Sequence, residues 1–423
     1  MELLITVIFI LGYAAIAFEH SIKINKAASA LLAGVLCWTA YIFFSSDAEV
    51  VSGELTHHFG NLSGILFFLM GAMTIVELMD AHDGFEVITS RITTTDKRKL
   101  LWIISIITFF LSAVLDNLTT AIVMVSLCRK LIGDRNDRMF FVGMIIIAAN
   151  AGGAWSPIGD VTTTMLWMGG QITSWNIILK LFIPSLICLL VPLAAISFIM
   201  KGKIERPADA VSSVKTIPST PFEKNLIFFS GVGALIFVPV FKTITHLPPY
   251  MGILFGLGIL WVITEIIHRE KDEGDKDALS VVHALRKIDV PCILFFLGIL
   301  VAISALESTH ILEHFAQAMD KKIGNQSVIV ICIGLLSAIV DNVPLVAATM
   351  GMYDLQTFPA DDYLWEFIAY CAGTGGSILI IGSAAGVAVM GIEKINFFWY
   401  LKKIGWLALL GYFAGAVAYM LMN

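Results

Sequence analysis

Two hexapeptides decide the fold of this chain: SAVLDN at residues 112–117 and SAIVDN at residues 337–342. Each lies inside a long apolar stretch, at 100–131 and at 326–353. An aspartate at such a place either caps a helix that restarts there or serves as a functional group, because a carboxylate is costly in an apolar environment. Two copies in equivalent stretches favour a ligand role at both bends, and the same residue can also act as a cap.

The composition around these hexapeptides indicates a membrane protein. The 423 residues are 58% hydrophobic and only 14% charged, and the mean hydropathy is +0.86, more apolar surface than a soluble fold of this size could cover. A net charge of −6 offers no basic patch for nucleic acid. We find no nucleophile-and-base motif, so we expect neither an enzyme nor a cofactor. The six cysteines lie singly in apolar runs, and we interpret them as small buried side chains.

Apolar runs long enough to cross a bilayer recur along the chain. A crossing helix needs about 20 residues. A bend at Asp116 and Asn117 leaves two arms of about 15 residues, too short to cross separately, so we predict re-entrant hairpins at 100–131 and 326–353. The predicted spans lie near 3–18, 27–45, 61–80, 138–168, 174–199, 224–241, 250–268, 290–308, 363–391 and 396–422.

The distribution of basic residues predicts the orientation. With the N-terminus outside and both hairpins re-entering, 23 of the 27 lysines and arginines lie on the inside. Cytoplasmic loops carry such an excess. We therefore expect an integral membrane protein, in a bacterial inner membrane, with its N-terminus outside.

The two halves of the sequence resemble each other. LFFL at 66–69 recurs at 294–297, and ANAGG at 149–153 recurs as AGTGG at 372–376, in the same order as the hexapeptides. We predict a first membrane repeat over 1–199, a cytoplasmic linker over 200–223 and a second repeat over 224–423. Each repeat would contain five transmembrane helices and one re-entrant hairpin, with broken helices at 138–168 and 363–391. Five crossings are an odd number, so the repeats would be inverted, as in secondary transporters.

The hexapeptides carry oxygen ligands for a small hard cation. Ser112 and Ser337 precede Asp116 and Asp341 by four residues, which places them on the same helical face. Asn117 and Asn342 add amide oxygens, and hard oxygen sites suit hard cations. We predict that the two aspartates and two asparagines bind such a cation, and that the aspartates also carry protons.

The stretch NAGGAWSPIGDVTTT at 150–164 cannot remain one regular helix. Unwound backbone at this depth is tolerated where it lines a cavity. Asn150, Asp160, Thr162 and Thr163 are candidate ligands there, with Ser377 and Ser383 in the second half. Because Ser383 is the counterpart of Asp160, we predict one shared site of three carboxylates. Helix packing through glycines and a cap role for Asp160 are the alternatives.

The third span ends in a polar cluster that includes Asp80 and His82. Histidine titrates near neutrality, so these two residues are candidates for pH sensing. A solvated helix end is the simpler interpretation, and we favour it.

The sequence EHSIKINKAASA at 19–30, both hairpins and the stretch 150–164 resemble NhaD-type sodium/proton antiporters of the ion transporter superfamily. The resemblance implies exchange of sodium or lithium for protons, and a homodimer in which each protomer has a scaffold and a moving transport domain. The family motifs match Ser112, Asp116, Asn117, Asn150, Asp160, Thr162, Thr163, Ser337, Asp341 and Asn342.

Related families leave alternatives open. Dicarboxylate carriers place a serine where this chain has aspartate at the hairpin tip, and a carboxylate there would repel an anion. An arsenite or organic-anion carrier of the same superfamily is the first alternative. A cation channel is the alternative from another class.

Overall fold

The computed structural model describes residues 1–90, 92–205, 219–269 and 271–423. The regular elements in these ranges are helices, and the β contact found there is a single bridge between Asp96 and Lys203. The predicted linker over 200–223 lies mostly outside the described residues. The first half contains α1 (Glu2–Ala17), α2 (Glu19–Ile22), α3 (Lys26–Phe44), α4 (Ala48–Ala81), α5 (Glu86–Thr89), α6 (Lys97–Leu115), α7 (Asn117–Leu131), α8 (Arg135–Ala154), α9 (Val161–Met168) and α10 (Ser174–Ser197).

The second half follows a similar order of long, short and broken helices. It contains α11 (Pro221–Thr245), α12 (Pro249–Ile267), α13 (Glu273–Ala278), α14 (Val281–Lys287), α15 (Val290–Ser308), α16 (Ile311–Ile323), α17 (Gln326–Leu336), α18 (Asn342–Met352), α19 (Tyr363–Gly375), α20 (Ala384–Glu393), α21 (Phe397–Tyr400), a π-helical turn (Leu401–Gly405) and α22 (Trp406–Met422).

Nine helices of the described chain are long and apolar enough to cross a membrane. They confirm an all-α polytopic membrane protein. They are α3, α4, α6, α8, α10, α11, α12, α15 and the last helix, which runs from Phe397 to Met422.

Two sequence predictions of helix length were wrong. Helix α4 has 34 residues and begins at Ala48, well before the span that we predicted at 61–80. Helix α6 has 19 residues, since it begins at Lys97 behind an Asp96 cap, before the hairpin that we predicted to start at residue 100. The argument that this arm is too short to cross therefore fails.

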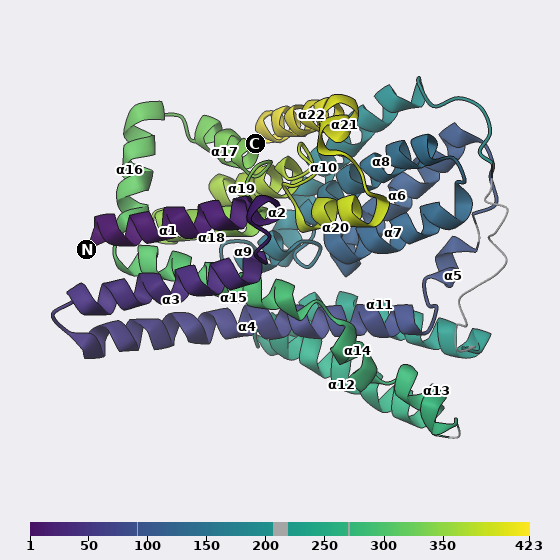
Figure 1. Ribbon diagram of the computed structural model, residues 1–423, viewed down its shortest axis with the longest axis horizontal. Coiled ribbons are helices and arrows are strands. Elements are labelled where there is room, and N and C mark those ends of the chain that lie inside the picture. The colour runs from purple at the N-terminus through teal and green to yellow at the C-terminus, as the bar shows by residue number, and fades with distance from the viewer. Residues whose placement is uncertain (91, 206–218, 270) are drawn as a thin grey trace.

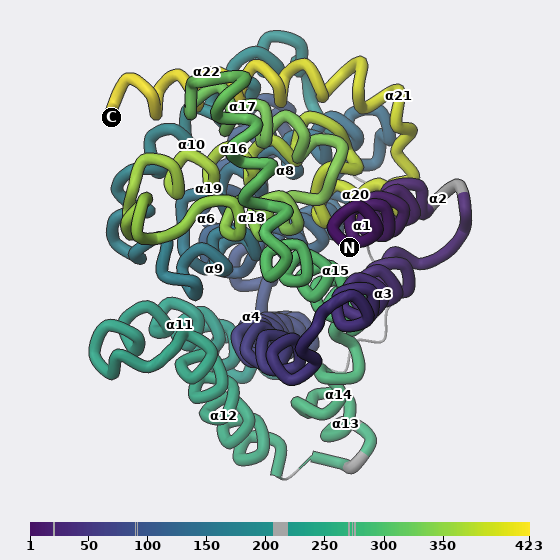
Figure 2. Tube along the Cα trace, turned by 90° about the vertical axis from the view of Figure 1, so that its left-hand side faces the viewer, coloured from purple at the N-terminus to yellow at the C-terminus, as the bar shows by residue number. Residues whose placement is uncertain are grey.

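The helices form two layers. The first, which we call the scaffold layer, contains α1, α3, α4, α11, α12 and α15, which pack mainly on one another. The second, the hairpin layer, contains α6 to α10 and α17 to α22. Figure 2 shows α4, α11 and α12 on one side and α8, α10, α19 and α22 on the other, with α18 and α15 between them. Helices α10 and α22 also pack within the hairpin layer.

The two hairpins lie toward opposite ends of the molecule. Helices α6 and α7 are near the end that carries α5 and α13, whereas α17 and α18 are near the end that carries α16 (Figure 1). Asp116 separates the helices of the first pair, and Asp341 is the N-cap of the second helix of the other.

Both predicted breaks occur in the hairpin layer, between α8 and α9 and between α19 and α20. Glycines allow the helices beside these breaks to approach closely. A Cβ on Gly152 would lie 2.2 Å from the Phe109 carbonyl oxygen, and one on Gly375 would lie 2.0 Å from the Gly334 carbonyl oxygen. Close helix packing, the alternative interpretation of the glycines from the sequence, therefore explains Gly152 and Gly375.

Candidate functional site

Asp160 lies at the centre of the polar groups in the hairpin layer. It is the N-cap of α9, and its Oδ1 accepts hydrogen bonds of 2.9 Å from both the backbone N–H and the hydroxyl of Thr162. Asn117 donates to Oδ2 at 2.7 Å, and Asn342 donates to the same oxygen at 3.3 Å. Asp160 is only 2% exposed, so a buried carboxylate contacts the asparagines of both hairpins.

Asn150 extends this network into the second half of the chain. Its side-chain oxygen accepts a bond of 3.0 Å from Asn117, and its nitrogen donates to Ser377 Oγ at 2.9 Å and to Ser383 Oγ at 3.0 Å. Hydrogen bonds in a dry interior are strong and leave little freedom to the groups that make them. The network therefore fixes both helix breaks relative to each other.

Asp116 occupies the first bend with a positive φ of 91°, which side-chain-bearing residues rarely adopt. Its carboxylate accepts hydrogen bonds of 2.8 Å from the backbone N–H and from the hydroxyl of Thr119, so it does cap α7. Non-glycine residues adopt this conformation at a cost, and such outliers cluster at functional sites. Asp116 and Asp160 line one cavity of about 50 Å³, which is room for a few water-sized groups.

Asp341 lines a different cavity, with Tyr13, Glu19 and Lys26. No group of three acidic, histidine or cysteine side chains that could hold a metal ion occurs in the described part of the chain. The single site of three carboxylates stays a prediction: Asp116 and Asp160 line one cavity, and Asp341 lines the other. The bends separate Asp341 from Asp160 although the neighbouring Asn342 contacts Asp160, since successive side chains at a helix start point in different directions.

Three hydroxyl groups at the predicted site, those of Ser112, Ser337 and Thr163, donate to backbone carbonyls. Ser112 donates to the Ala149 carbonyl at 2.6 Å, and Ser337 donates to the equivalent Ala372 carbonyl at 2.8 Å. Thr163 donates to the carbonyl oxygen of Asp160 at 2.9 Å. Both serines thus attach a hairpin to its broken helix by the same contact, which supports the sequence alignment of the halves.

His82 does not end a solvated helix, as we had favoured. It is fully buried and stacks on His268, with ring centroids 5.0 Å apart. Its Nδ1 donates to the Leu78 carbonyl at 2.7 Å, so the 3.3 Å contact between the two Nε2 atoms requires His268 to be the donor. Burial lowers the pKa of His82, and burial together with His82 lowers the pKa of His268 to about 4. No feature of the sequence indicated His268 as a partner of His82.

Several known proteins are similar to this chain in sequence or in fold. The sequence profile of the citrate transporter family (CitMHS) matches residues 13–365. Sodium/proton antiporter 2 of Arabidopsis thaliana is 48% identical, over 98% of this chain and 98% of that protein. The Na(+)/H(+) antiporter NhaD of Vibrio parahaemolyticus is 31% identical, over 89% of this chain and 95% of its own. The chain belongs to the NhaD-type sodium/proton antiporter family.

Two further matches extend the comparison. Sodium/proton antiporter 1 of Arabidopsis thaliana is 50% identical to all of this chain, which covers 73% of that protein. The crystal structure of the Alcanivorax borkumensis YdaH transporter matches with a TM-score of 0.56, at 12% identity, over 89% of both chains. The latter match concerns the fold alone.

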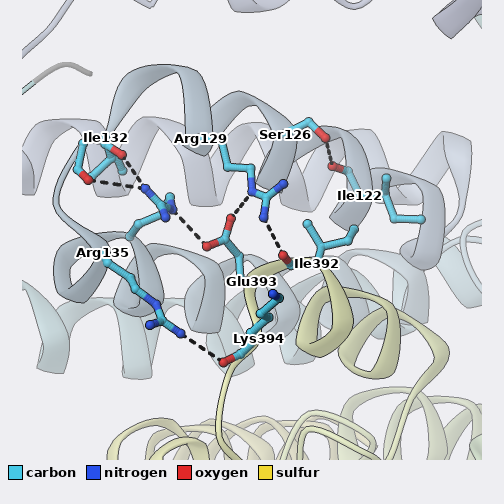
Figure 3. Close-up of polar contacts among 10 residues, drawn as sticks. Ile122, Ser126, Arg129, Ile132, Arg135, Ile392, Glu393 and Lys394 are labelled. Carbon is cyan, nitrogen blue, oxygen red and sulfur yellow. Dashed lines mark hydrogen bonds and ion pairs between the residues drawn. The ribbon is translucent and has the colours of Figure 1, made fainter. Parts of the chain in front are cut away.

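An ion-pair cluster that sequence analysis missed connects the halves of this NhaD-type chain. Glu393, at the end of α20, is 1% exposed at its side chain and contacts Arg129 Nε at 2.5 Å and Arg138 Nε at 2.9 Å (Figure 3). Arg129 also donates to the Ile392 carbonyl at 2.5 Å, and Arg135 donates to the Lys394 carbonyl at 3.2 Å. A glutamate in an otherwise apolar helix was the available signal. Its partners are more than 250 residues away, so sequence could not supply them.

Proposed function

We propose that this protein exchanges sodium or lithium ions for protons across a membrane. The observation that carries the proposal is the buried Asp160 carboxylate. It accepts hydrogen bonds from Asn117 and Asn342, one from each hairpin, and it lines a cavity together with Asp116. Carboxylate and amide oxygens suit a small hard cation. A proton and a sodium ion would compete for the same carboxylate oxygens, and exchange follows from that competition. The names of the plant and bacterial relatives support the choice of ions.

The transport mechanism that we propose is alternating access. The two repeats would be inverted, and the hairpin layer would move against the scaffold layer as one body and carry the site across. The division of the helices into two layers supports this, as does the position of the hairpins toward opposite ends. Asp116, Asp341 and Asp160 would hold the ions, with Asn117, Asn150 and Asn342 positioning them.

We also propose an orientation, a membrane and an oligomeric state for the chain. We place the N-terminus outside because the basic residues then lie inside. We assign the chain to a bacterial inner membrane, as a homodimer that exchanges ions without a cofactor. Light scattering of the detergent-purified protein would test the dimer, and labelling of cysteines introduced at each end would test the orientation.

A citrate or other organic-anion carrier is the second candidate, because the matching family profile is described as a citrate transporter. Carboxylates repel an anion unless cationic side chains or free backbone N–H groups face it. Among the described residues that line the two cavities, Lys26 is the only basic one, and it already contacts Asp341. The site therefore favours a cation.

Transport by purified protein in liposomes would decide between these candidates. Vesicles with an internal pH dye would receive sodium, lithium, potassium, citrate or arsenite. We expect proton movement with sodium and lithium that saturates at a low rate per protein, as expected of a carrier and not of a channel. Proton movement driven by citrate or arsenite, but not by sodium, would overturn the proposal.

A further inference from the structure

Lys26 joins the scaffold layer to the second hairpin. It is the first residue of α3, and its Nζ lies 3.4 Å from Asp341 Oδ2. The same ammonium group lies 4.3 Å from the centre of the Phe295 ring, on α15. The backbone N–H of Lys26 donates to Glu19 Oε1 at 3.1 Å, which fixes the start of the helix that presents it.

The two repeat-equivalent aspartates consequently have different electrostatic environments. Asp116 is held by two bonds of 2.8 Å from Thr119, and none of the described residues along its cavity is basic. Asp341 has only a 3.4 Å contact with the backbone N–H of Val343 from its own helix. At the second bend the ammonium group of Lys26 contacts the aspartate, as Thr119 does at the first bend. The similarity of the two repeats in sequence does not predict this difference between Asp116 and Asp341.

The cavity at Asp341 has room for a cation beside the ammonium group. Its volume is about 90 Å³, and its polar lining includes Tyr13, Glu19, Lys26 and Asp341. Two carboxylates and one ammonium group give it one negative charge in excess when all three are ionised. The side chains of Lys26 and Asp341 are 23% and 13% exposed, so solvent and ions reach this pair more easily than the centre of the network.

We propose that the ammonium group of Lys26 is a tethered competitor of the transported cation at Asp341. When the cation binds Asp341, the ammonium group withdraws, and it returns when the cation leaves. A buried carboxylate without a counter-ion is costly, so Lys26 stabilises Asp341 while the site holds no cation. Because α3 belongs to the scaffold layer and Asp341 to the hairpin layer, the pair also joins the two layers in this conformation. This inference rests on the proposed sodium exchange.

The test compares sodium binding by Lys26→Met, Lys26→Arg and the wild-type protein. Methionine keeps most of the apolar stem that packs on Phe295 and removes the charge. Lys242→Met is a matched control, because Lys242 Nζ lies 4.6 Å from the Trp167 ring centre and donates to a backbone carbonyl, without a carboxylate partner. Radioactive sodium binding to purified protein at one alkaline pH gives the half-saturating concentration directly.

We expect Lys26→Met to lower the half-saturating sodium concentration by about two- to fivefold, the scale of a partly exposed ion pair. Lys26→Arg and Lys242→Met should bind as the wild-type protein does. If Lys26→Met does not elute as folded protein, Lys26→Gln carries the same expectation. Equal or weaker sodium binding in a folded neutral variant, beside normal binding by the wild type, overturns this inference alone. Absence of sodium binding by the wild type overturns the proposed function and this inference with it.

Discussion

Replacement of Asp160 by asparagine tests whether this residue is part of an ion site or only a helix cap. Asparagine keeps the size of the side chain and can still accept the bonds from Thr162, as N-cap asparagines do. Its amide nitrogen would then replace Oδ2, to which Asn117 donates at 2.7 Å and Asn342 at 3.3 Å in the wild type. The amide N–H groups of Asn117 and Asn342 would then face another N–H donor, and the site would lose one negative charge.

The expected size of the effect follows from the contact that is removed. A hydrogen bond or ion contact with a buried charged group contributes about 1–3 kcal/mol, which corresponds to about 5- to 150-fold in affinity. We expect Asp160→Asn to raise the half-saturating sodium concentration within this range and to change the pH profile of exchange, because one carboxylate that protons and sodium share is missing. Transport should continue at saturating sodium.

The assay is sodium-driven proton movement in liposomes, measured over a series of sodium concentrations and pH values. Asp160→Ser is the second variant, since Ser383 occupies the equivalent cap in the other half. Asp134→Asn is the matched control, because Asp134 caps α8 through the backbone N–H of Asp137 at 2.8 Å and lies in an exposed contact. Unchanged sodium affinity and an unchanged pH profile in both Asp160 variants would make Asp160 a cap and refute its role in the site.

Three other predictions concern motion, stability and pH. A reversible crosslink between Ile122→Cys on α7 and Met73→Cys on α4, which line one cavity, should stop exchange until reductant is added; full exchange by crosslinked protein would refute the moving hairpin layer. Glu393→Gln should lower the free energy of unfolding in denaturing detergent by about 3 kcal/mol, since it leaves two guanidinium groups without their carboxylate, whereas Glu265→Gln at an exposed pair should change little. Because folding lowers the pKa of His82 and His268, their neutral forms stabilise the fold above about pH 6.5, and stability should fall as the pH drops toward 4. Thermal unfolding at pH 7 and pH 5 measures this loss, which should be smaller in His268→Phe, and an equal loss in both proteins would count against the histidine pair.

Local sequence predicted the bends and breaks of this fold well. Asp116, Asp341 and Asp160 each cap a helix that restarts there, and aspartate followed by a new apolar run is a local signal. Helix ends were harder to place. The sequence of α4 has polar residues such as His57 and His58 in its first turns, and these look like a loop although the helix continues through them.

The contacts of the site depend on distances that sequence does not contain. The equivalence of Ser112 and Ser337 could be inferred from the repeat, and both make the same bond. The contact between Lys26 and Asp341, which lie 315 residues apart, could not be inferred from the sequence, because the first repeat has no equivalent pair. The repeat argument led to the expectation of one shared site of three carboxylates, and it did not indicate that Asp341 lines a different cavity from Asp116 and Asp160.

The central claim is that the aspartates at the two bends hold the exchanged ions. A sodium pulse to liposomes that contain wild-type protein, Asp116→Asn or Asp341→Asn, with an internal pH dye, tests it most directly. We predict proton movement in the wild type with sodium and lithium but not with potassium, and none in either variant, while both variants elute as folded protein. Near-normal sodium-dependent proton movement in both variants would contradict the account.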